Sequence, residues 1–481
     1  SIHEAALVDY AAYWLKRQAD GSFRTTLSPS SHGARVIRNT PFTTPWRTIR
    51  IADNAAGLVE NDLELNLNEP NKLGDVSWIH PSKYIGIWWG MISGRWSWAE
   101  GPTHGATTAR TRQYIDFAAK HGFRGVLVEG WNRGWNGDWF GHGDEFSFTK
   151  AVPDFDLPAL AAYAKSKGVH LIGHHETGGN IANYEPQLDA AFAQNERMGI
   201  EVTKTGYVAD LGGIIAPGDK PGEVRMEYHD GQRQVEHHLK VVETAAKYQI
   251  AVDVHEPIHD TGERRTWPNM LSREGARGQE YNAWGGEGGN PPEHESILFF
   301  TRMLSGPMDF TPGIFDLLIK RQTGKPRSPD EPRPRSTLAK QLALYVVLYS
   351  PVQMAADLIE NYDRQPAFQF IRDVAVDWDT TRVLAGRIGD YVAVARKTKS
   401  KDEWFVGAIT DEAARTLDLP LSFLPNGRRY VAQIYADAPN ASWRENPEAI
   451  RISSQPVTSA TRLHVVFAPG GGQAIRLIPA P

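Results

Sequence analysis

The sequence predicts an α/β protein, a (β/α)8 TIM barrel flanked by an N-terminal β-sandwich remnant and a C-terminal antiparallel β-domain. Short apolar runs alternate with amphipathic helices between about residues 79 and 379, while strand-like stretches separated by turn residues come before and after. The length of 481 residues suits two or three domains. We therefore divide the chain into residues 1–78, 79–379 and 380–481.

Residues 1–78 are predicted to be the end of the β-sandwich. Gly, Pro, Asn and Asp turns separate short strand-like stretches, a pattern typical of β-structure. Residues 1–8 resemble the middle of a strand, and no initiating Met, basic segment or apolar segment stands before them. We therefore expect this region to complete a β-domain that begins upstream of Ser1. The predicted strands are Tyr10–Lys16, Thr48–Ile51 and Leu63–Leu67.

Residues 79–379 have the pattern of a parallel sheet covered by helices on both faces, because the predicted strands are near-continuous apolar runs. Roughly seven or eight β/α units over about 300 residues fit a TIM barrel better than an open doubly wound sheet. The predicted strands are Tyr84–Trp89, Gly125–Gly130, Val169–Glu176, Ile200–Val208, Ile250–Glu256, Pro307–Ile314 and Pro351–Leu358. The predicted helices are Thr108–His121, Leu157–Lys167, Tyr184–Met198, Val235–Tyr248 and Thr337–Leu348.

Residues 380–481 return to short strands with turn chemistry between them, which predicts a small antiparallel β-domain. The Gly-rich turn at residues 469–472 separates the last two strands. The predicted strands are Arg387–Ala395, Trp404–Ile409, Arg429–Ile434, Arg462–Phe467 and Ala474–Ile478.

Composition and charge exclude several classes of function. A net charge of -5 is too small to argue for nucleic acid or an anionic membrane as a partner. The absence of Cys excludes a disulfide framework, a thiolate nucleophile and a cysteine zinc site. No apolar run reaches the length of a membrane span.

Polar residues gather where the predicted barrel strands end. The third strand ends in His174-His175-Glu176, the fifth ends in His255-Glu256, and the fourth carries Lys204. The loops after barrel strands form the pocket of such folds, so functional residues are found there. A single glutamate at such a place is as often a partner in a salt bridge. Two glutamates that each follow a histidine at a strand end favour a functional site instead.

Two more carboxylates, Glu274 and Glu280, lie in the segment that follows. Their spacing also fits a solvated surface helix. Together with Glu176 and Glu256, however, they would form a cluster that repels itself unless a cation or protons neutralise it. Oxygen ligands suit a hard ion such as Ca²⁺, whereas the nearby histidines permit Zn²⁺, so side-chain chemistry alone leaves the ion open.

A set of linked motifs resembles glycoside hydrolase family 97, the calcium-dependent α-glucosidase and α-galactosidase family. The resemblance covers essentially the whole chain and includes residues 2–7 and 66–70, which match the end of the family's N-terminal β-sandwich. The central motifs are His174–Thr177, Lys204–Val208, His255–Pro257, Glu274–Tyr281 and Gly306–Gly313.

The resemblance implies the inverting α-glucosidase branch of this family. The two base glutamates of that branch map onto Glu176 and Glu256. The retaining α-galactosidase branch has an Asp nucleophile on the fourth strand, and the matching position here is Gly206. The general acid maps onto Glu280. Inversion needs its acid and base carboxyl groups about 6.5–9.5 Å apart, so that a water fits between base and sugar.

The resemblance also implies a Ca²⁺ site, substrate contacts and a location. The implied calcium ligands are Glu256, Glu274, Glu280 and, from the N-terminal region, Glu4. The residues implied to contact the sugar are Lys204, His174, His255 and Trp88. The substrate is expected to be an oligosaccharide or α-glucoside, cleaved from its non-reducing end. A periplasmic or secreted location is expected from the habit of the family.

Three alternatives compete with this hypothesis. The first is a retaining α-galactosidase of the same family. The second is a non-catalytic carbohydrate-binding protein, which the presence of all four carboxylates disfavours. The third is a metal-dependent amidohydrolase-like barrel using His174, His175 and His255. That class needs a His-x-His motif on the first strand, and residues 84–89 contain no His.

Overall fold

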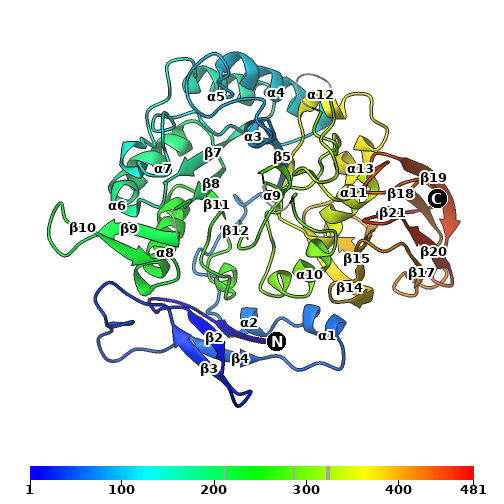
Figure 1. Ribbon diagram of the computed structural model, residues 1–481, viewed down its shortest axis with the longest axis horizontal. Helices are drawn as coiled ribbons and strands as arrows, with labels where there is room; N and C mark the ends of the chain where they lie inside the picture. The colour runs from blue at the N-terminus through cyan, green and yellow to red at the C-terminus, as the bar shows by residue number, and fades with distance from the viewer. Residues whose placement is uncertain (210–211, 285–287, 321–324, 481) are drawn as a thin grey trace.

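A computed structural model describes residues 1–209, 212–284, 288–320 and 325–480. Its centre is a parallel sheet curved into a near-barrel, with helices around it, as Figure 1 shows. Within the described residues, the sheet has seven strands in the order β12-β11-β8-β7-β6-β5-β13. These strands are β5 Ser82–Gly86, β6 Gly125–Leu127, β7 His170–Glu176, β8 Val202–Gly206, β11 Ala251–Val254, β12 Met270–Arg273 and β13 Val352–Ala355.

The predicted strand over Pro307–Ile314 is not a regular strand, although its segment fills the place between β12 and β13. Met308 forms a single parallel bridge with Arg273, and the amide of Asp309 donates to the Arg273 carbonyl at 3.2 Å. Pro307 and Pro312 have no N–H to donate, so a continuous ladder cannot form there. The barrel is closed by irregular backbone at this position.

The barrel helices follow the predicted alternation closely. Helix α4 begins after Thr107, whose hydroxyl accepts from the Arg110 amide, and ends at Gly122, which adopts the left-handed φ of +75° common at helix ends. The predicted helix over residues 184–198 is divided by a 3-10 turn at Glu185–Gln187. The main helices are α4 Thr108–His121, α5 Leu157–Ser166, α7 Leu188–Arg197, α8 Gln232–Lys247 and α11 Leu338–Val347. Shorter ones are α3 Trp88–Ile92, α6 Ile181–Tyr184, α9 Tyr281–Trp284, α10 His294–Phe299, α12 Ile359–Tyr362 and α13 Phe368–Asp373.

The N-terminal region forms two small antiparallel sheets beside the barrel, β1 with β4 and β2 with β3. The predicted strand over Leu63–Leu67 is wrong, because this segment is helix α2. Its alternating leucines do not mark a sheet face: Glu64 between them is buried, accepts from the Thr48 hydroxyl at 2.9 Å and pairs with Arg50. The elements are β1 Ile2–Ala5, β2 Tyr13–Arg17, β3 Phe23–Leu27, β4 Trp46–Ile49, α1 Ala55–Val59 and α2 Leu63–Asn66. A hairpin of β9 Gly213–Pro217 and β10 Val224–Tyr228 extends from the barrel.

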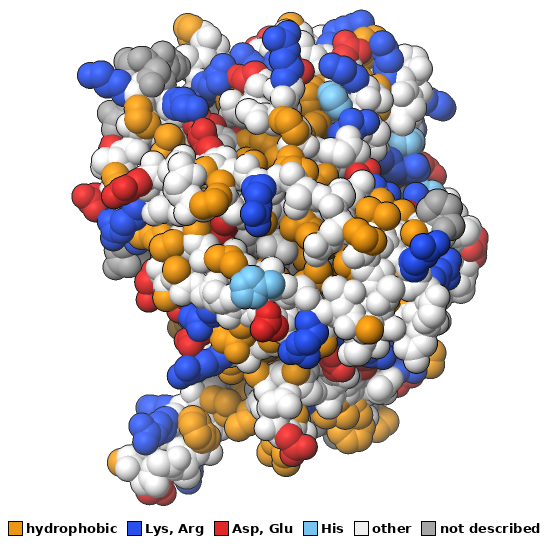
Figure 2. All heavy atoms as spheres, turned by 90° about the vertical axis from the view of Figure 1, so that its right-hand side faces the viewer, with side chains coloured by type: hydrophobic (Ala, Val, Ile, Leu, Met, Phe, Trp, Pro, Cys, Tyr) orange, Lys and Arg blue, Asp and Glu red, His pale blue; other side chains and the backbone are white. Residues whose placement is uncertain are grey.

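The C-terminal region is an antiparallel sheet in the order β14-β15-β16-β21-β18-β19, with β17 paired to β20. Helix α11 is buried along its whole length, because it lies between this sheet and the barrel. Figure 2 shows that charged and hydrophobic side chains are intermingled over this side of the molecule. The strands are β14 Trp378–Arg387, β15 Tyr391–Thr398, β16 Trp404–Thr410, β17 Arg415–Pro420, β18 Tyr430–Asp437, β19 Ile450–Val457, β20 Arg462–Phe467 and β21 Gly472–Pro479.

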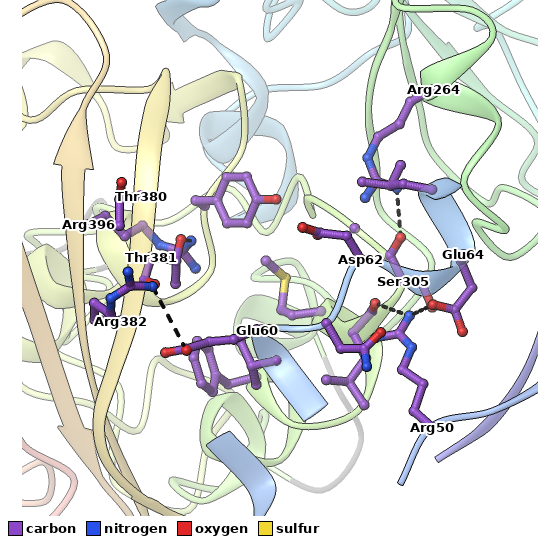
Figure 3. Close-up of a pocket in the computed structure, with 18 of the residues that line it drawn as sticks. Arg50, Glu60, Asp62, Glu64, Arg264, Ser305, Thr380, Thr381, Arg382 and Arg396 are labelled. Carbon is purple, nitrogen blue, oxygen red and sulfur yellow. Dashed lines mark hydrogen bonds and ion pairs between the residues drawn. The ribbon is translucent and has the colours of Figure 1, made fainter. Parts of the chain in front are cut away.

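A polar cavity of about 410 Å³ lies where the N-terminal region, the barrel and the C-terminal sheet meet (Figure 3). Several of its charged side chains are already paired: Arg50 with Glu64, Arg264 with Asp260, and Arg382 with Glu60. Of these pairs, Arg382 with Glu60 joins the C-terminal sheet to the N-terminal region, and Arg50 also donates to the Leu304 carbonyl of the barrel at 2.9 Å. Among the described residues, no helix is both long and apolar enough to cross a membrane.

Candidate active site

A second cavity, of about 350 Å³, opens at the C-terminal ends of the barrel strands. Seven of the residues predicted from the sequence line it together: Glu176, Glu256, Glu280, His174, His255, Lys204 and Trp88. They come from segments that are far apart in the chain. The parallel sheet brings these segments to one edge, because all its strands end on the same side.

Strand β7 divides its polar residues between two faces. His174 and Glu176 line the cavity, whereas His175 between them faces the helices, where its Nδ1 lies 2.8 Å from the Tyr184 hydroxyl. Successive side chains of a strand point to opposite sides, so this division follows from the strand itself. His175 therefore cannot share a metal ion with His174 and His255, and the amidohydrolase-like alternative loses one of its ligands.

The two proposed base glutamates are held by backbone amides. Glu176 Oε1 accepts from the amides of Gly178 at 2.8 Å and Val208 at 3.2 Å. Glu256 Oε2 accepts from the Tyr207 amide at 2.9 Å, and Glu256 itself has the uncommon φ of +43°. Burial and the neighbouring charge of Glu256 raise the pKa of Glu176 well above its ordinary value.

Glu274 and Glu280 complete a group of crowded carboxylates. Glu274 follows β12 and Glu280 immediately precedes α9. Burial and the charges of Glu280 and Glu256 raise the pKa of Glu274 well above its ordinary value. Burial and the charge of Glu256 raise the pKa of Glu280 to about 8, a value at which it holds its proton at neutral pH.

A buried network beneath the cavity was not predicted from the sequence. Asp309 Oδ2 lies 3.3 Å from Lys204 Nζ and 2.9 Å from His255 Nε2, and it accepts from the Tyr84 hydroxyl at 3.2 Å. Burial would raise the pKa of Asp309, but Lys204 and His255 hold it below its ordinary value. Asp309 therefore orients two of the residues expected to contact the sugar. The sequence signals were the place of Asp309 in the motif Gly306–Gly313 and its being the single acid among the apolar residues 307–314.

Aromatic side chains form much of the cavity wall. Trp98 donates to Glu129 Oε2 at 3.1 Å and stacks with Trp135 at 6.1 Å between ring centroids. Trp284, at the end of α9, lines the same cavity and is 53% exposed. Flat apolar faces beside carboxylates and a lysine suit a ligand that has both C–H faces and many hydroxyl groups.

Among the described residues, two groups of side chains have the spacing of metal ligands. The ligand atoms of His255, Glu256 and Glu274 lie within 4.8 Å of one another, as do those of Asp253, His255 and Asp309. The second group is already neutralised by Lys204. In the first group, within the described part of the chain, no Lys or Arg pairs with either glutamate. A hard divalent cation fits that group, because carboxylate oxygens are its preferred ligands and its charge would relieve their repulsion.

Glu4 is not brought into this group. It is fully buried, accepts from the Tyr13 amide at 3.1 Å, lies 2.7 Å from His259 Nε2 and pairs with Arg47. These partners occupy both of its oxygens. The structure therefore gives no support to Glu4 as a metal ligand. Its short strand packs near residues 259–261, beyond the end of the fifth barrel strand.

Family models for three consecutive regions match the chain. The model described as glycoside hydrolase 97 matches residues 88–276, and those for the N-terminal domain and the C-terminal, oligomerisation domain match residues 1–70 and 377–478. A glycoside hydrolase family 97 enzyme from Pseudoalteromonas sp. strain K8, solved in complex with acarbose, is 55% identical. The comparison of the two structures gives a TM-score of 0.97, and the match covers 100% of this chain and 72% of the Pseudoalteromonas chain. The chain belongs to glycoside hydrolase family 97.

Two further relatives have names or bound sugars of different kinds. A variant of the Pseudoalteromonas enzyme, solved with panose, is 54% identical with a TM-score of 0.97 and the same coverage. A curated relative from Bacteroides thetaiotaomicron, 30% identical over 446 residues and 90% of this chain, is named a retaining α-galactosidase. The chain spans 59% of the length of that curated relative.

The fourth strand of this family 97 chain ends in a glycine whose side-chain space is occupied by the carboxylate of Glu176. A Cβ atom built on Gly206 would overlap the Oε2 atom of Glu176. Glu176 is in turn held in place by the amides of Gly178 and Val208. The carboxylate of Glu176 therefore occupies the space that a side chain at position 206 would need.

Proposed function

We propose that this chain carries an exo-acting, inverting α-glucosidase that hydrolyses terminal α-linked glucose from malto-oligosaccharide-like substrates. The observation that carries this proposal is the exclusion of a side chain at Gly206 by Glu176. A retaining glycosidase needs a nucleophilic carboxylate close to the anomeric carbon. The family resemblance places that nucleophile at position 206, where this chain has no carboxylate and where Glu176 occupies the space of a side chain.

The proposed roles follow from the environment of each carboxyl group. Glu280, buried and with a raised pKa, donates its proton to the glycosidic oxygen of the leaving group. Glu176 and Glu256, held by amides of the β8 end, act together as the base that accepts one proton from the attacking water. Burial and the charge of Glu256 raise the pKa of Glu176, and a cation bound at Glu256 would offset the second of these causes, so that Glu176 ionises. Lys204, His174 and His255 bind sugar hydroxyls, and Trp88 packs against the ring. The product of this reaction is the β-anomer of glucose, because water attacks opposite to the departing oxygen.

Solved relatives support glucose as the sugar. Two structures about 55% identical to this chain were solved with acarbose and with panose, and panose is a trisaccharide of α-linked glucose. Retaining α-galactosidase remains the second candidate, because a curated relative at 30% identity has that name. The space around Gly206 disfavours it.

Proton NMR of freshly formed product distinguishes the two candidates. The protein is incubated in parallel with an α-glucoside such as maltotriose and with an α-galactoside, and the first anomeric signal is recorded before mutarotation. We expect β-glucose from the first substrate and little release from the second. Early α-glucose would refute inversion, and early α-galactose would refute the assigned sugar as well. Release of neither sugar would refute the proposed α-glucosidase activity of this chain.

We propose that Ca²⁺ binds between Glu256 and Glu274, with the unprotonated oxygen of Glu280 as a further ligand, so that the other oxygen of Glu280 still carries the proton for the leaving group. When bound, the ion holds Glu256 in its ionised form and orients sugar hydroxyls; the leaving oxygen needs no metal because it receives a proton. Removal of the ion by EDTA should lower activity by about 10-fold or more, and Ca²⁺ should restore it. Restoration by Zn²⁺ alone would contradict the choice of ion, and full activity in EDTA would contradict the site.

Family resemblance supports a periplasmic or secreted location, where oligosaccharides reach such an enzyme. The C-terminal family model is described as an oligomerisation domain, so we propose self-association through residues 377–478. Size-exclusion chromatography with light scattering measures this directly.

A further inference from the structure

One pair of consecutive amides holds both proposed bases. The Tyr207 amide donates to Glu256 Oε2 at 2.9 Å, and the next amide, of Val208, donates to Glu176 Oε1 at 3.2 Å. The two carboxylates come from different strands, yet they are bound to one short stretch of backbone. The position of that backbone therefore sets where the two bases lie relative to each other.

The side chain of Tyr207 points away from the cavity. Its neighbours Thr205, Gly206, Val208 and Ala209 line the cavity wall, whereas Tyr207 does not and is only 1% exposed. Its hydroxyl lies 3.0 Å from Nε2 of His237, on helix α8. Tyr207 thus connects the backbone that holds the bases to the outer helix layer, without reaching the substrate.

His237 is itself held by Glu185. The His237 Nδ1 atom lies 2.9 Å from Glu185 Oε1, and Glu185 also accepts from Arg233 at 2.7 Å and Lys240 at 2.9 Å. Burial would raise the pKa of Glu185, but His237 and the two cations lower it to about 2, so it is ionised. An ionised Glu185 needs a proton on Nδ1 of His237. Burial lowers the pKa of His237, so its ring is neutral and its Nε2 is an acceptor. The Tyr207 hydroxyl therefore donates to Nε2.

We propose that Tyr207 is a positioning residue that sets the placement of Glu176 and Glu256. The contacts from Tyr207 through His237 to Glu185 form its anchor. The proposal rests on the proposed function, in which these two glutamates are the bases. A base must lie within hydrogen-bond reach of the water it activates. Small displacements of catalytic groups cost large factors in rate, so loss of the anchor acts on kcat. The sugar-binding residues Lys204 and His174 are not in this chain of contacts.

The values of kcat and KM of conservative variants at Tyr207 and His237 test whether this anchor positions the bases. Tyr207→Phe removes one hydroxyl and should lower kcat on maltotriose roughly 10-fold, with KM changed by less than about 2-fold. His237→Gln keeps an acceptor and should retain more activity than His237→Leu. The double variant Tyr207→Phe/His237→Leu should be no slower than His237→Leu alone, because both changes break the same connection.

A matched control removes a different buried tyrosine hydroxyl. Tyr345 is also 1% exposed, and its hydroxyl donates to the Met354 carbonyl at 2.8 Å, far from the β8 end in the strand order. Tyr345→Phe should lower the melting temperature without changing kcat. A kcat of Tyr207→Phe equal to that of the wild type or of Tyr345→Phe overturns the proposal, as does strict additivity in the double variant.

Crystal structures of the wild type and of Tyr207→Phe test the positioning role of Tyr207 without any substrate. We expect the amides of Tyr207 and Val208, and with them the Glu256 carboxylate, to shift relative to the wild type. Unchanged positions of these groups would overturn the proposal even if the wild type were inactive. Inactivity of the wild type on α-glucosides would instead refute the proposed function alone, so the two failures are distinguishable.

Discussion

Replacing Glu280 by glutamine is expected to lower kcat on a malto-oligosaccharide by about 10²- to 10⁴-fold, the usual contribution of a general acid. A sugar alkoxide is a poor leaving group and needs a proton as the bond breaks, and Gln cannot supply one. A nitrophenyl α-glucoside leaves as a stable phenolate without protonation. On that substrate the loss should therefore be far smaller. Initial rates on the two substrates, measured with the same enzyme preparation, give the comparison.

The control for this change is Glu196→Gln, which removes an exposed carboxylate from the outer part of α7. It should leave both rates as they are in the wild type. An equal loss on the two substrates by Glu280→Gln would argue against the acid role and for a purely structural or metal-binding one. Calcium is kept in excess throughout, so that a weaker site remains occupied.

Substituting Ala for Gly206 should lower kcat by about 10²-fold or more while changing stability little. The added methyl group overlaps Oε2 of Glu176, the free end of a flexible side chain, which can swing aside at small energetic cost. Swinging aside removes Glu176 from the amides of Gly178 and Val208 and from the water it activates. Glucose release and thermal unfolding are measured on the same variant.

Gly125→Ala is the matched control, because its methyl group would lie 2.7 Å from Cδ1 of Ile172 in the barrel core. Overpacking of this kind costs about 1–3 kcal/mol, so this variant should lose stability and keep its kcat. Glu176→Gln provides the comparison for activity, and combining it with Gly206→Ala should lower kcat no further. Wild-type kcat in Gly206→Ala would show that Glu176 does not act from the observed position.

Much of the fold could be predicted from local sequence patterns. Buried parallel strands are apolar along their length and the helices between them are amphipathic, so the barrel repeats could be located without contacts. Helix α4 agrees with its prediction because an N-cap at Thr107 and a glycine at 122 mark its ends in the sequence. The prediction of a strand at 63–67 from its alternating leucines was wrong, because Glu64 between them is buried against Arg50, a contact between two elements that the alternation of one segment does not show.

The sequence by itself predicted several of the residues that meet at the candidate active site, because the ends of parallel strands converge whatever the details of packing. Glu176, Glu256, Glu280 and Lys204 were found in this way and line one cavity. The tertiary structure alone decided what each side chain touches. It placed Glu4 with Arg47 and His259, away from the carboxylate group. These contacts join residues up to 255 positions apart. Side-chain pairing at that range depends on how whole domains pack, which local sequence patterns do not encode.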